Sequence, residues 1–162
     1  MTNNSRPVAV FDIDNTLADT THRQRFLERK PRDWRAFFAA APQDPPLAEG
    51  IALALRTAAE CELVYLTGRP ARCRRDTLDW LAVHGLPEGR VSMRADGDRR
   101  PARVTKLELL RELALGREVR MLVDDDELVC QAAERAGFTV VRARWAVPSA
   151  ALTDAQEREG RT

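Results

Sequence analysis

The chain has 162 residues, with 26 Lys or Arg, 25 Asp or Glu and a formal net charge of +1 at pH 7. This length suits one domain with a hydrophobic core and is short for two. The nearly balanced charge gives no global argument for nucleic-acid binding, and a 44% share of hydrophobic residues excludes a disordered or fibrous protein.

Cysteine use and the N-terminal residues bear on the compartment. Cys61, Cys73 and Cys130 are odd in number and too widely spaced for a zinc cluster. Free thiols are typical of a reducing compartment. Residues 1–6 lack the apolar core of a secretory signal, and no apolar run reaches the length of a membrane span. We therefore expect a cytoplasmic protein with no membrane segment.

Apolar strand-like runs alternate with helical patterns along the chain. Strands are predicted at about 7–11, 62–66, 119–123 and 138–142, with a weaker one at 91–93. Helices are predicted at about 47–60, 70–84, 104–114 and 126–136, and Ser149 is expected to cap a short final helix before a frayed end at 157–162. This alternation indicates parallel pairing through βαβ crossovers. The expected fold is α/β, a Rossmann-like parallel sheet flanked by helices, in one domain of residues 1–162.

Residues 19–46 interrupt the alternation. Thr20 or Thr21 can cap a short helix, and a second helical stretch carries Trp34, Phe37 and Phe38. Prolines at 42, 45 and 46 end the segment. We interpret it as a small helical insertion; ordinary surface helices with their aromatic residues in the core are the alternative.

The motif Asp12-Ile13-Asp14-Asn15-Thr16 follows the first predicted strand directly. In an open α/β sheet the ligand crevice lies outside the carboxyl ends of the strands. Two carboxylates there suit a nucleophile, Asp12, and a proton donor, Asp14, that act on one phosphorus atom. The alternative is an acidic turn that only caps a helix.

Two polar clusters in the middle of the chain suit phosphate. The Thr67 hydroxyl and the backbone N–H groups after the second strand can bind a phosphate, with Gly68 allowing close approach and Arg69 a bidentate contact. Lys106, one of two lysines, can neutralise charge on the phosphoryl group and on Asp12. The alternatives are a plain turn, a surface arginine and a solvent-exposed helix lysine.

Three consecutive acids end the strand predicted at 119–123. Adjacent carboxylates repel one another unless a cation is present, and hard oxygen ligands suit Mg²⁺. Asp124 is the expected direct ligand together with Asp12, and Asp125 is expected to orient a metal-bound water or Lys106. Asp126 is a candidate helix cap, and capping by all three acids is the alternative.

These four clusters, in this order, resemble the haloacid dehalogenase-like superfamily of phosphohydrolases over about residues 6–145. Within it the sequence is similar to the 3′-phosphatase domain of phage-type polynucleotide kinase. The residues that carry this likeness are Phe11–Ala18, Lys30–Trp34 with Phe37 and Phe38, Ser92–Arg94, Gly97, Asp98, Arg100 and Pro101. The resemblance implies a cap at residues 19–46 and a backbone carbonyl of Asp14 as a further Mg²⁺ ligand.

The sequence thus predicts a Mg²⁺-dependent phosphomonoesterase with an aspartyl-phosphate intermediate. The resemblance implies 3′-phosphorylated nucleic-acid ends, or a nucleotide, as substrate. No G-x-x-x-x-G-K-[ST] phosphate loop occurs, so no kinase activity is expected from these residues. A small-molecule phosphatase and a non-catalytic phosphate-binding module are the alternatives, and the oligomeric state does not follow from the sequence.

Two other features remain open at this stage. The first is a locally basic set that either follows a nucleic-acid backbone or forms a solvated face: Arg72, Arg74, Arg75, Arg94, Arg99, Arg100 and Arg103. The second is His22, which is either a substrate contact or a surface or packed histidine, whereas His84 is expected to be structural.

Overall fold

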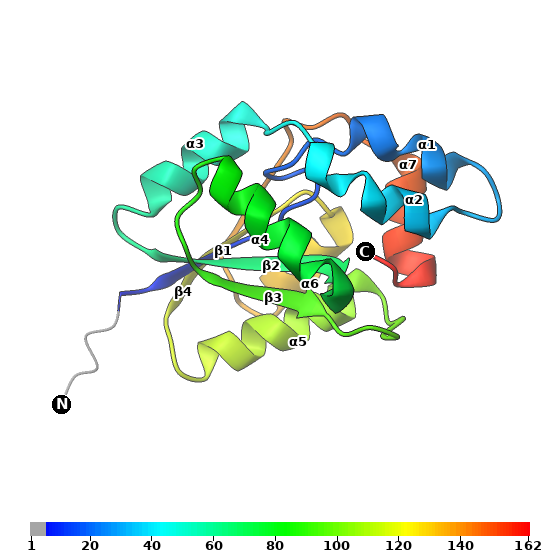
Figure 1. Cartoon of the computed structure of the whole chain (residues 1–162). Helices are drawn as coiled ribbons and strands as arrows, with labels where there is room; N and C mark the ends of the chain where they lie inside the picture. Colours follow the sequence, from blue (N-terminus) through cyan, green and yellow to red (C-terminus); the bar gives the residue numbers. More distant parts are fainter. Residues whose placement is uncertain (1–5) are drawn as a thin grey trace.

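A computed structural model describes residues 6–162 and shows one parallel sheet between two layers of helices (Figure 1). The sheet has the order β3-β2-β1-β4-β5. Its strands are β1 (Val8–Phe11), β2 (Glu62–Pro70), β3 (Arg90–Arg94), β4 (Val119–Asp124) and β5 (Val140–Arg142). The Rossmann-like fold is therefore confirmed, including the weakest predicted strand. Because the chain builds outward from β1 on one side and then returns to add β4 on the other, the topological switch point lies at β1 and β4.

The two faces of the sheet bury alternate residues of the same strand. On β1, Ala9 and Phe11 join a cluster with Trp80, whereas Val8 and Val10 join a second cluster with Leu110. One face is covered by α3 (Ala48–Thr57) and α4 (Arg74–Val83), and the other by α5 (Ala102–Ala114) and α6 (Glu127–Arg135) (Figure 1). Burial on both faces explains why the central strand β1 and the Leu63–Leu66 part of β2 are continuous apolar runs rather than alternating ones.

The second strand is longer than the sequence predicts. It continues through Thr67 to Pro70, and its register against β3 shifts between Thr67 and Pro70. Pro70 has extended backbone angles, so a 3₁₀ turn, η3 (Ala71–Cys73), precedes α4. The helix predicted from residue 70 therefore begins at Arg74, because pairing with β3 keeps the chain extended as far as Pro70 and the 3₁₀ turn follows.

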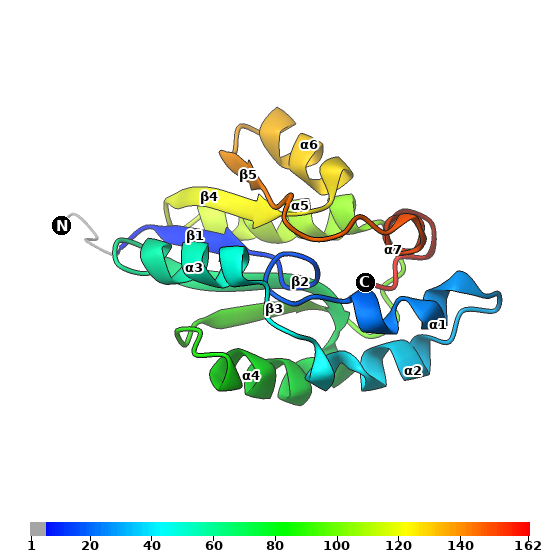
Figure 2. The same ribbon diagram turned by 90° about the horizontal axis from the view of Figure 1, so that it is seen from above.

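Residues 19–46 form four short elements: η1 (Thr21–Arg23), α1 (Arg25–Glu28), α2 (Trp34–Ala39) and η2 (Ala41–Gln43). They lie beyond the carboxyl ends of the strands, beside α7 (Ala150–Asp154) and η4 (Ala155–Glu159), as Figure 2 shows from above. Their aromatic residues pack with Leu152 and Ala155 in a third cluster, in which Trp34 is only 8% exposed. The insertion thus has a core of its own, shared with the end of the chain.

Between residues 6 and 162, the structure contains no helix with the length and apolar character that a membrane crossing needs. The cytoplasmic location stays a prediction.

Candidate active site

The loop after β1 places two carboxylates at the switch point of the sheet. The backbone N–H of Asp12 donates to the Val123 carbonyl at 2.9 Å, which ties the loop to β4. Asn15 adopts a left-handed conformation with φ 59°, which asparagine tolerates better than most residues. Its side-chain oxygen accepts a hydrogen bond from the Thr20 hydroxyl at 2.8 Å. This tight turn keeps both Asp12 and Asp14 buried at the carboxyl end of β1.

Lys106 joins the first and last of the predicted clusters. Its Nζ lies 2.9 Å from Asp12 Oδ1 and 2.7 Å from Asp124 Oδ2, and its side chain is buried. Burial alone would lower the pKa of Lys106, but the Asp12 and Asp124 carboxylates raise it above its usual value. Lys106 is therefore a fixed positive charge inside the site and not an exposed helix lysine.

The acidic group at the end of β4 fits a hard cation. Asp12, Asp124 and Asp125 each offer an oxygen atom, and these three atoms lie within 4.8 Å of one another. Burial and the charge of Asp12 raise the pKa of Asp124 to about 6, against the opposing effect of Lys106. Burial and the charges of Asp12 and Asp124 likewise raise the pKa of Asp125, against the opposing effect of Lys106. Among the described residues, Asp125 Oδ1 has no hydrogen-bond partner. These carboxylates repel one another, and a Mg²⁺ ion bound to their oxygen atoms would relieve that repulsion.

Asp126 has a different use from its two neighbours. Its carboxylate accepts hydrogen bonds from the backbone N–H groups of Leu128 at 2.9 Å and Val129 at 3.4 Å. It is therefore the N-cap of α6, as one reading of the sequence predicts. The cap fixes where α6 begins, and Asp124 supports it by accepting from the Asp126 N–H at 2.9 Å.

The candidate phosphate turn lies in the last part of β2. The Thr67 hydroxyl is buried and accepts a hydrogen bond from the Arg69 N–H at 3.2 Å. The Gly68 carbonyl accepts from Arg94 Nε at 3.2 Å. Arg94, assigned from the sequence to a basic set, is thus buried against the site.

Arg69 is directed at carboxylates. Its Nε and Nη2 lie 3.0 and 2.6 Å from Asp14 Oδ1, and Nη2 also lies 3.3 Å from Asp44 Oδ2. The bidentate phosphate contact predicted from the sequence would need Arg69 to leave Asp14. In the present arrangement its guanidinium orients the second aspartate of the motif.

Arg23 and Asp44 are site residues that the sequence reasoning missed. Arg23 bonds Asp14 Oδ1 at 2.7 Å and both oxygens of Asp44 at 2.8 and 2.7 Å, and it is completely buried. His22 Nε2 also lies 2.7 Å from Asp44, and the exposed histidine side chain is thereby held at the surface of the buried network, which favours a structural over a substrate-contacting role. Burial would raise the pKa of Asp14, but Arg69 and Arg23 hold it well below its usual range. No sequence periodicity signals such a pair, because both residues lie in short irregular turns.

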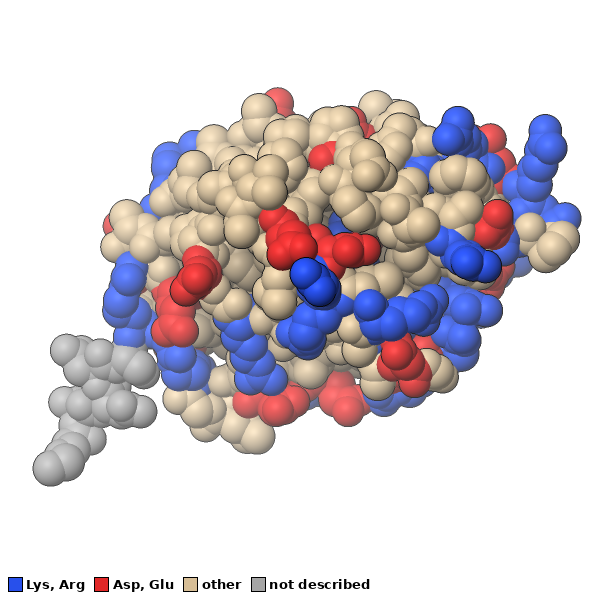
Figure 3. Space-filling view, viewed as in Figure 1, with Lys and Arg blue, Asp and Glu red and all other residues tan. Residues whose placement is uncertain are grey.

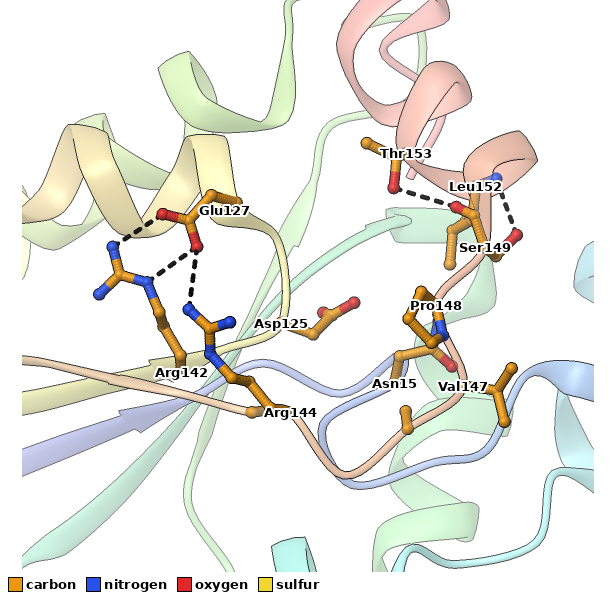
Figure 4. A pocket seen from close by; sticks show the side chains of 12 residues that line it. Asn15, Asp125, Glu127, Arg142, Arg144, Val147, Pro148, Ser149, Leu152 and Thr153 are labelled. Atoms are coloured by element: carbon orange, nitrogen blue, oxygen red, sulfur yellow. Dashed lines mark hydrogen bonds and ion pairs between the residues drawn. The ribbon is translucent and has the colours of Figure 1, made fainter.

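A cavity of about 490 Å³ adjoins Asp125 and Asn15. Figure 4 shows Asp125 at the cavity, with Arg142 and Arg144 on one side of it and Pro148 on the other. Both arginines pair with Glu127, so the cavity wall on that side is largely charge-compensated. The cavity gives solvent-sized ligands a route to the acidic group.

The predicted basic set does not form a continuous free surface. Arg72 pairs with Asp96, Arg100 with Asp98 and Glu108, and Arg103 with Glu157. In the space-filling view, acidic and basic side chains are accordingly intermixed on this face (Figure 3). These ion pairs favour the solvated-face reading for Arg72, Arg100 and Arg103.

Comparison with known proteins identifies the family. The family model described as the polynucleotide kinase PNKP phosphatase domain matches residues 6–145. The chain belongs to this family. It is a phosphoric monoester hydrolase of the haloacid dehalogenase (HAD) superfamily, so the non-catalytic binding module is the weakest of the predicted functions. No curated protein sequence matches this member of the family significantly.

Solved structures support the fold at low sequence identity. A chain of the Pnkp1/Rnl/Hen1 RNA repair complex has a TM-score of 0.71 and 22% identity over 88% of this chain and 44% of that chain. The present chain therefore spans less than half of that relative. The class C acid phosphatase from Bacillus anthracis has a TM-score of 0.69 and 14% identity over 96% of this chain and 72% of that chain. The HAD-like hydrolase SP0104 from Streptococcus pneumoniae has a TM-score of 0.63 and 13% identity over 94% and 91%.

Removing the charge of Asp44 tests the buried network. Asp44→Asn should lower the free energy of unfolding by about 3 kcal/mol, because Arg23 loses its main partner inside the protein. Urea unfolding measures this change. Glu118→Gln, which removes an exposed partner of Arg120, is the matched control and should change stability little. Equal effects of the two substitutions would contradict a structural role for the network.

Proposed function

We propose that this phosphatase is a Mg²⁺-dependent polynucleotide 3′-phosphatase that forms an aspartyl-phosphate on Asp12. The observation that carries the proposal is the position of Asp12. Its carboxylate lies at the switch point of the sheet, 2.9 Å from Lys106 Nζ and inside the cluster formed with Asp124 and Asp125. Such a carboxylate is buried, charge-compensated and backed by a rigid strand, as a nucleophile must be.

In the first half-reaction an oxygen of Asp12 bonds to phosphorus as the bond to the leaving ester oxygen breaks. Lys106 Nζ lies 2.9 Å from Oδ1, whereas Oδ2 accepts a longer hydrogen bond, of 3.2 Å, from the uncharged Thr16 hydroxyl. Oδ2 is therefore the less restrained oxygen. Lys106 also offsets the negative charge that accumulates as a carboxylate approaches a phosphoryl group. The Thr67 hydroxyl and the backbone N–H groups beside it would hold the phosphoryl oxygens.

Asp14 is the proposed general acid and base. The described arrangement, with two arginines on its carboxylate, keeps it ionised. An ionised Asp14 suits the second half-reaction, in which it takes a proton from the water that hydrolyses the aspartyl-phosphate. The acid role in the first half-reaction needs a proton on Asp14, and so requires Arg69 or Arg23 to shift toward the incoming phosphoryl group.

The proposed ligands of Mg²⁺ are Asp12, Asp124 and the backbone carbonyl of Asp14, with Asp125 orienting a bound water. The unpartnered Asp125 oxygen and the raised pKa of Asp124 support this choice, since both are expected of an acidic group prepared for a cation. When bound, the ion would polarise the phosphoryl oxygens and shield the incoming carboxylate.

Two observations bear on the substrate. Family membership favours a polynucleotide end, and the similarity to a chain of an RNA repair complex agrees with it. The cavity of about 490 Å³ beside Asp125 has the volume of a small-ligand pocket. It favours the second candidate, a nucleotide or metabolite phosphatase. The insertion at residues 19–46, beyond the carboxyl ends of the strands, is proposed as the cap that selects between them.

Both acids of the motif should be needed, to different degrees. Asp12→Asn should abolish turnover and any trapped aspartyl-phosphate, because an amide does not attack phosphorus. Asp14→Asn should slow turnover by roughly a hundred- to ten-thousandfold, as loss of a general acid–base group does. Phosphate release and acid-quench trapping measure these effects, with Asp96→Asn on the surface as the control. Full activity of Asp12→Asn would rule out this mechanism.

Activity should depend on Mg²⁺. Excess EDTA should stop phosphate release, and added Mg²⁺ should restore it, because the clustered carboxylates of the site need a cation. Zn²⁺ should substitute poorly, since the proposed site lacks the nitrogen and sulfur ligands that this metal favours. Undiminished release in EDTA would contradict the metal site.

A phosphate-release screen separates the two substrate candidates. At matched concentrations, an oligonucleotide with a 3′-phosphate should be hydrolysed with a higher kcat/KM than the 5′-phosphorylated oligonucleotide of the same sequence, nucleoside monophosphates or sugar phosphates. Binding of the oligonucleotide should weaken with rising salt if several of its phosphates are neutralised. A preference for a mononucleotide or sugar phosphate would favour the second candidate instead.

A further inference from the structure

The last eight residues cover the candidate phosphate turn. We call residues 155–162 the C-terminal strap. Thr162 is 3% exposed, its hydroxyl lies 3.4 Å from Asp14 Oδ2, and its carbonyl oxygen lies 3.5 Å from Arg94 Nη2. A Cβ atom built on Gly68 would lie 2.0 Å from the carbonyl carbon of Thr162. The strap backbone therefore rests directly on Gly68, although the sequence suggests a frayed end.

The strap is anchored to the insertion at its beginning. Arg32 lies between Asp154 and Glu159, at 2.8 Å from each, and the Trp34 indole N–H donates to Glu159 at 3.1 Å. Ala155 packs in the aromatic cluster of the insertion. The strap is thus joined to the same unit that surrounds the mouth of the site.

Gly160 of the strap packs against the loop that precedes α5. Gly160 has a left-handed conformation with φ 56°, and a Cβ atom there would lie 2.0 Å from the Arg99 carbonyl oxygen. This close backbone contact requires glycine. In Figure 1 the chain end lies between α7 and the carboxyl ends of the strands. The strap therefore passes from the insertion to the loop before α5 and then ends on Gly68, over the site.

We propose that the C-terminal strap is an autoinhibitory gate that must leave Gly68 before a phosphoryl group binds there. The proposal rests on the proposed function, since Thr67 and Gly68 bind phosphate only if the chain is a phosphatase acting at this turn. Strap and phosphoryl group compete for the same space and for the same neighbours, Asp14 and Arg94. The apparent affinity for substrate is then reduced by the fraction of molecules in which the strap is docked.

Gly160→Ala tests the gate without altering a catalytic residue. The added Cβ meets the Arg99 backbone, so the docked state is destabilised. We expect kcat/KM toward p-nitrophenyl phosphate with Mg²⁺ to rise roughly three- to tenfold, as the undocked fraction grows. Gly137→Ala is the matched control, because Gly137 also has a positive φ of 92° but a Cβ there meets nothing within 4 Å. The control should leave kcat/KM unchanged.

A second variant and a proteolysis assay test the docking of the strap independently of the catalytic rate. Glu159→Gln weakens the anchor to Arg32 and should raise kcat/KM by a smaller factor. Trypsin cleavage after Arg158 and Arg161, followed by mass spectrometry, reports whether the strap is docked. Cleavage should be faster in Gly160→Ala, and faster in the unchanged protein with orthovanadate and Mg²⁺, because this phosphoryl mimic displaces the strap.

The outcomes distinguish the gate from the proposed function. Faster cleavage of Gly160→Ala with no gain in kcat/KM, or a loss of kcat/KM at an unchanged melting temperature, would overturn the gate. Cleavage that orthovanadate leaves unchanged would overturn it as well. Absence of phosphatase activity in every variant would instead contradict the proposed function, and the orthovanadate arm would still decide whether the strap and a phosphoryl mimic compete.

Discussion

The ion pairs of Lys106 with Asp12 and Asp124 are the interaction on which the rest of the site depends. They connect the carboxyl ends of β1 and β4, where the strand order reverses and a crevice is expected. Two buried carboxylates side by side would repel each other strongly without this ammonium group. The single positive charge of Lys106 does not balance the negative charge of Asp12, Asp124 and Asp125 together. The remaining negative charge is what makes the site suitable for a divalent cation.

A second buried network links the insertion to the loop after β1. Arg23 and Asp44 belong to the insertion, Asp14 to the loop after β1, and Arg69 to β2. Buried ion pairs of this kind contribute little net stability but fix geometry, and removing one partner is costly. The insertion is consequently not a separate flap resting on the core. Any movement of Arg23 changes the environment of the proposed general acid, so substrate recognition and proton transfer are physically coupled.

Access to Asp12, the proposed nucleophile, is restricted in the described arrangement. Asp12, Asp14, Thr67 and Lys106 are all nearly inaccessible to solvent. One approach is the cavity beside Asp125, and the other lies under the C-terminal strap at Gly68. The strap shares a hydrophobic cluster and the Arg32–Glu159 ion pair with the insertion, so opening the second approach involves the same unit that is proposed to select the substrate.

The sequence by itself determined the sheet, the helices and the order of the four polar clusters, because continuous apolar runs and local motifs depend on short stretches of chain. Residues that follow parallel strands meet at the carboxyl-end edge of the sheet, so the sequence also predicted that Asp12 and Asp124 lie close together. Only the tertiary structure decided the partners of Arg69, the burial of Arg23 with Asp44, and the docking of Thr162 on Gly68. The ion pairs of Arg23 and Arg69 join residues between 9 and 55 positions apart, and Thr162 lies 148 positions from Asp14. Charge pairing across such distances leaves no periodic signal along the chain.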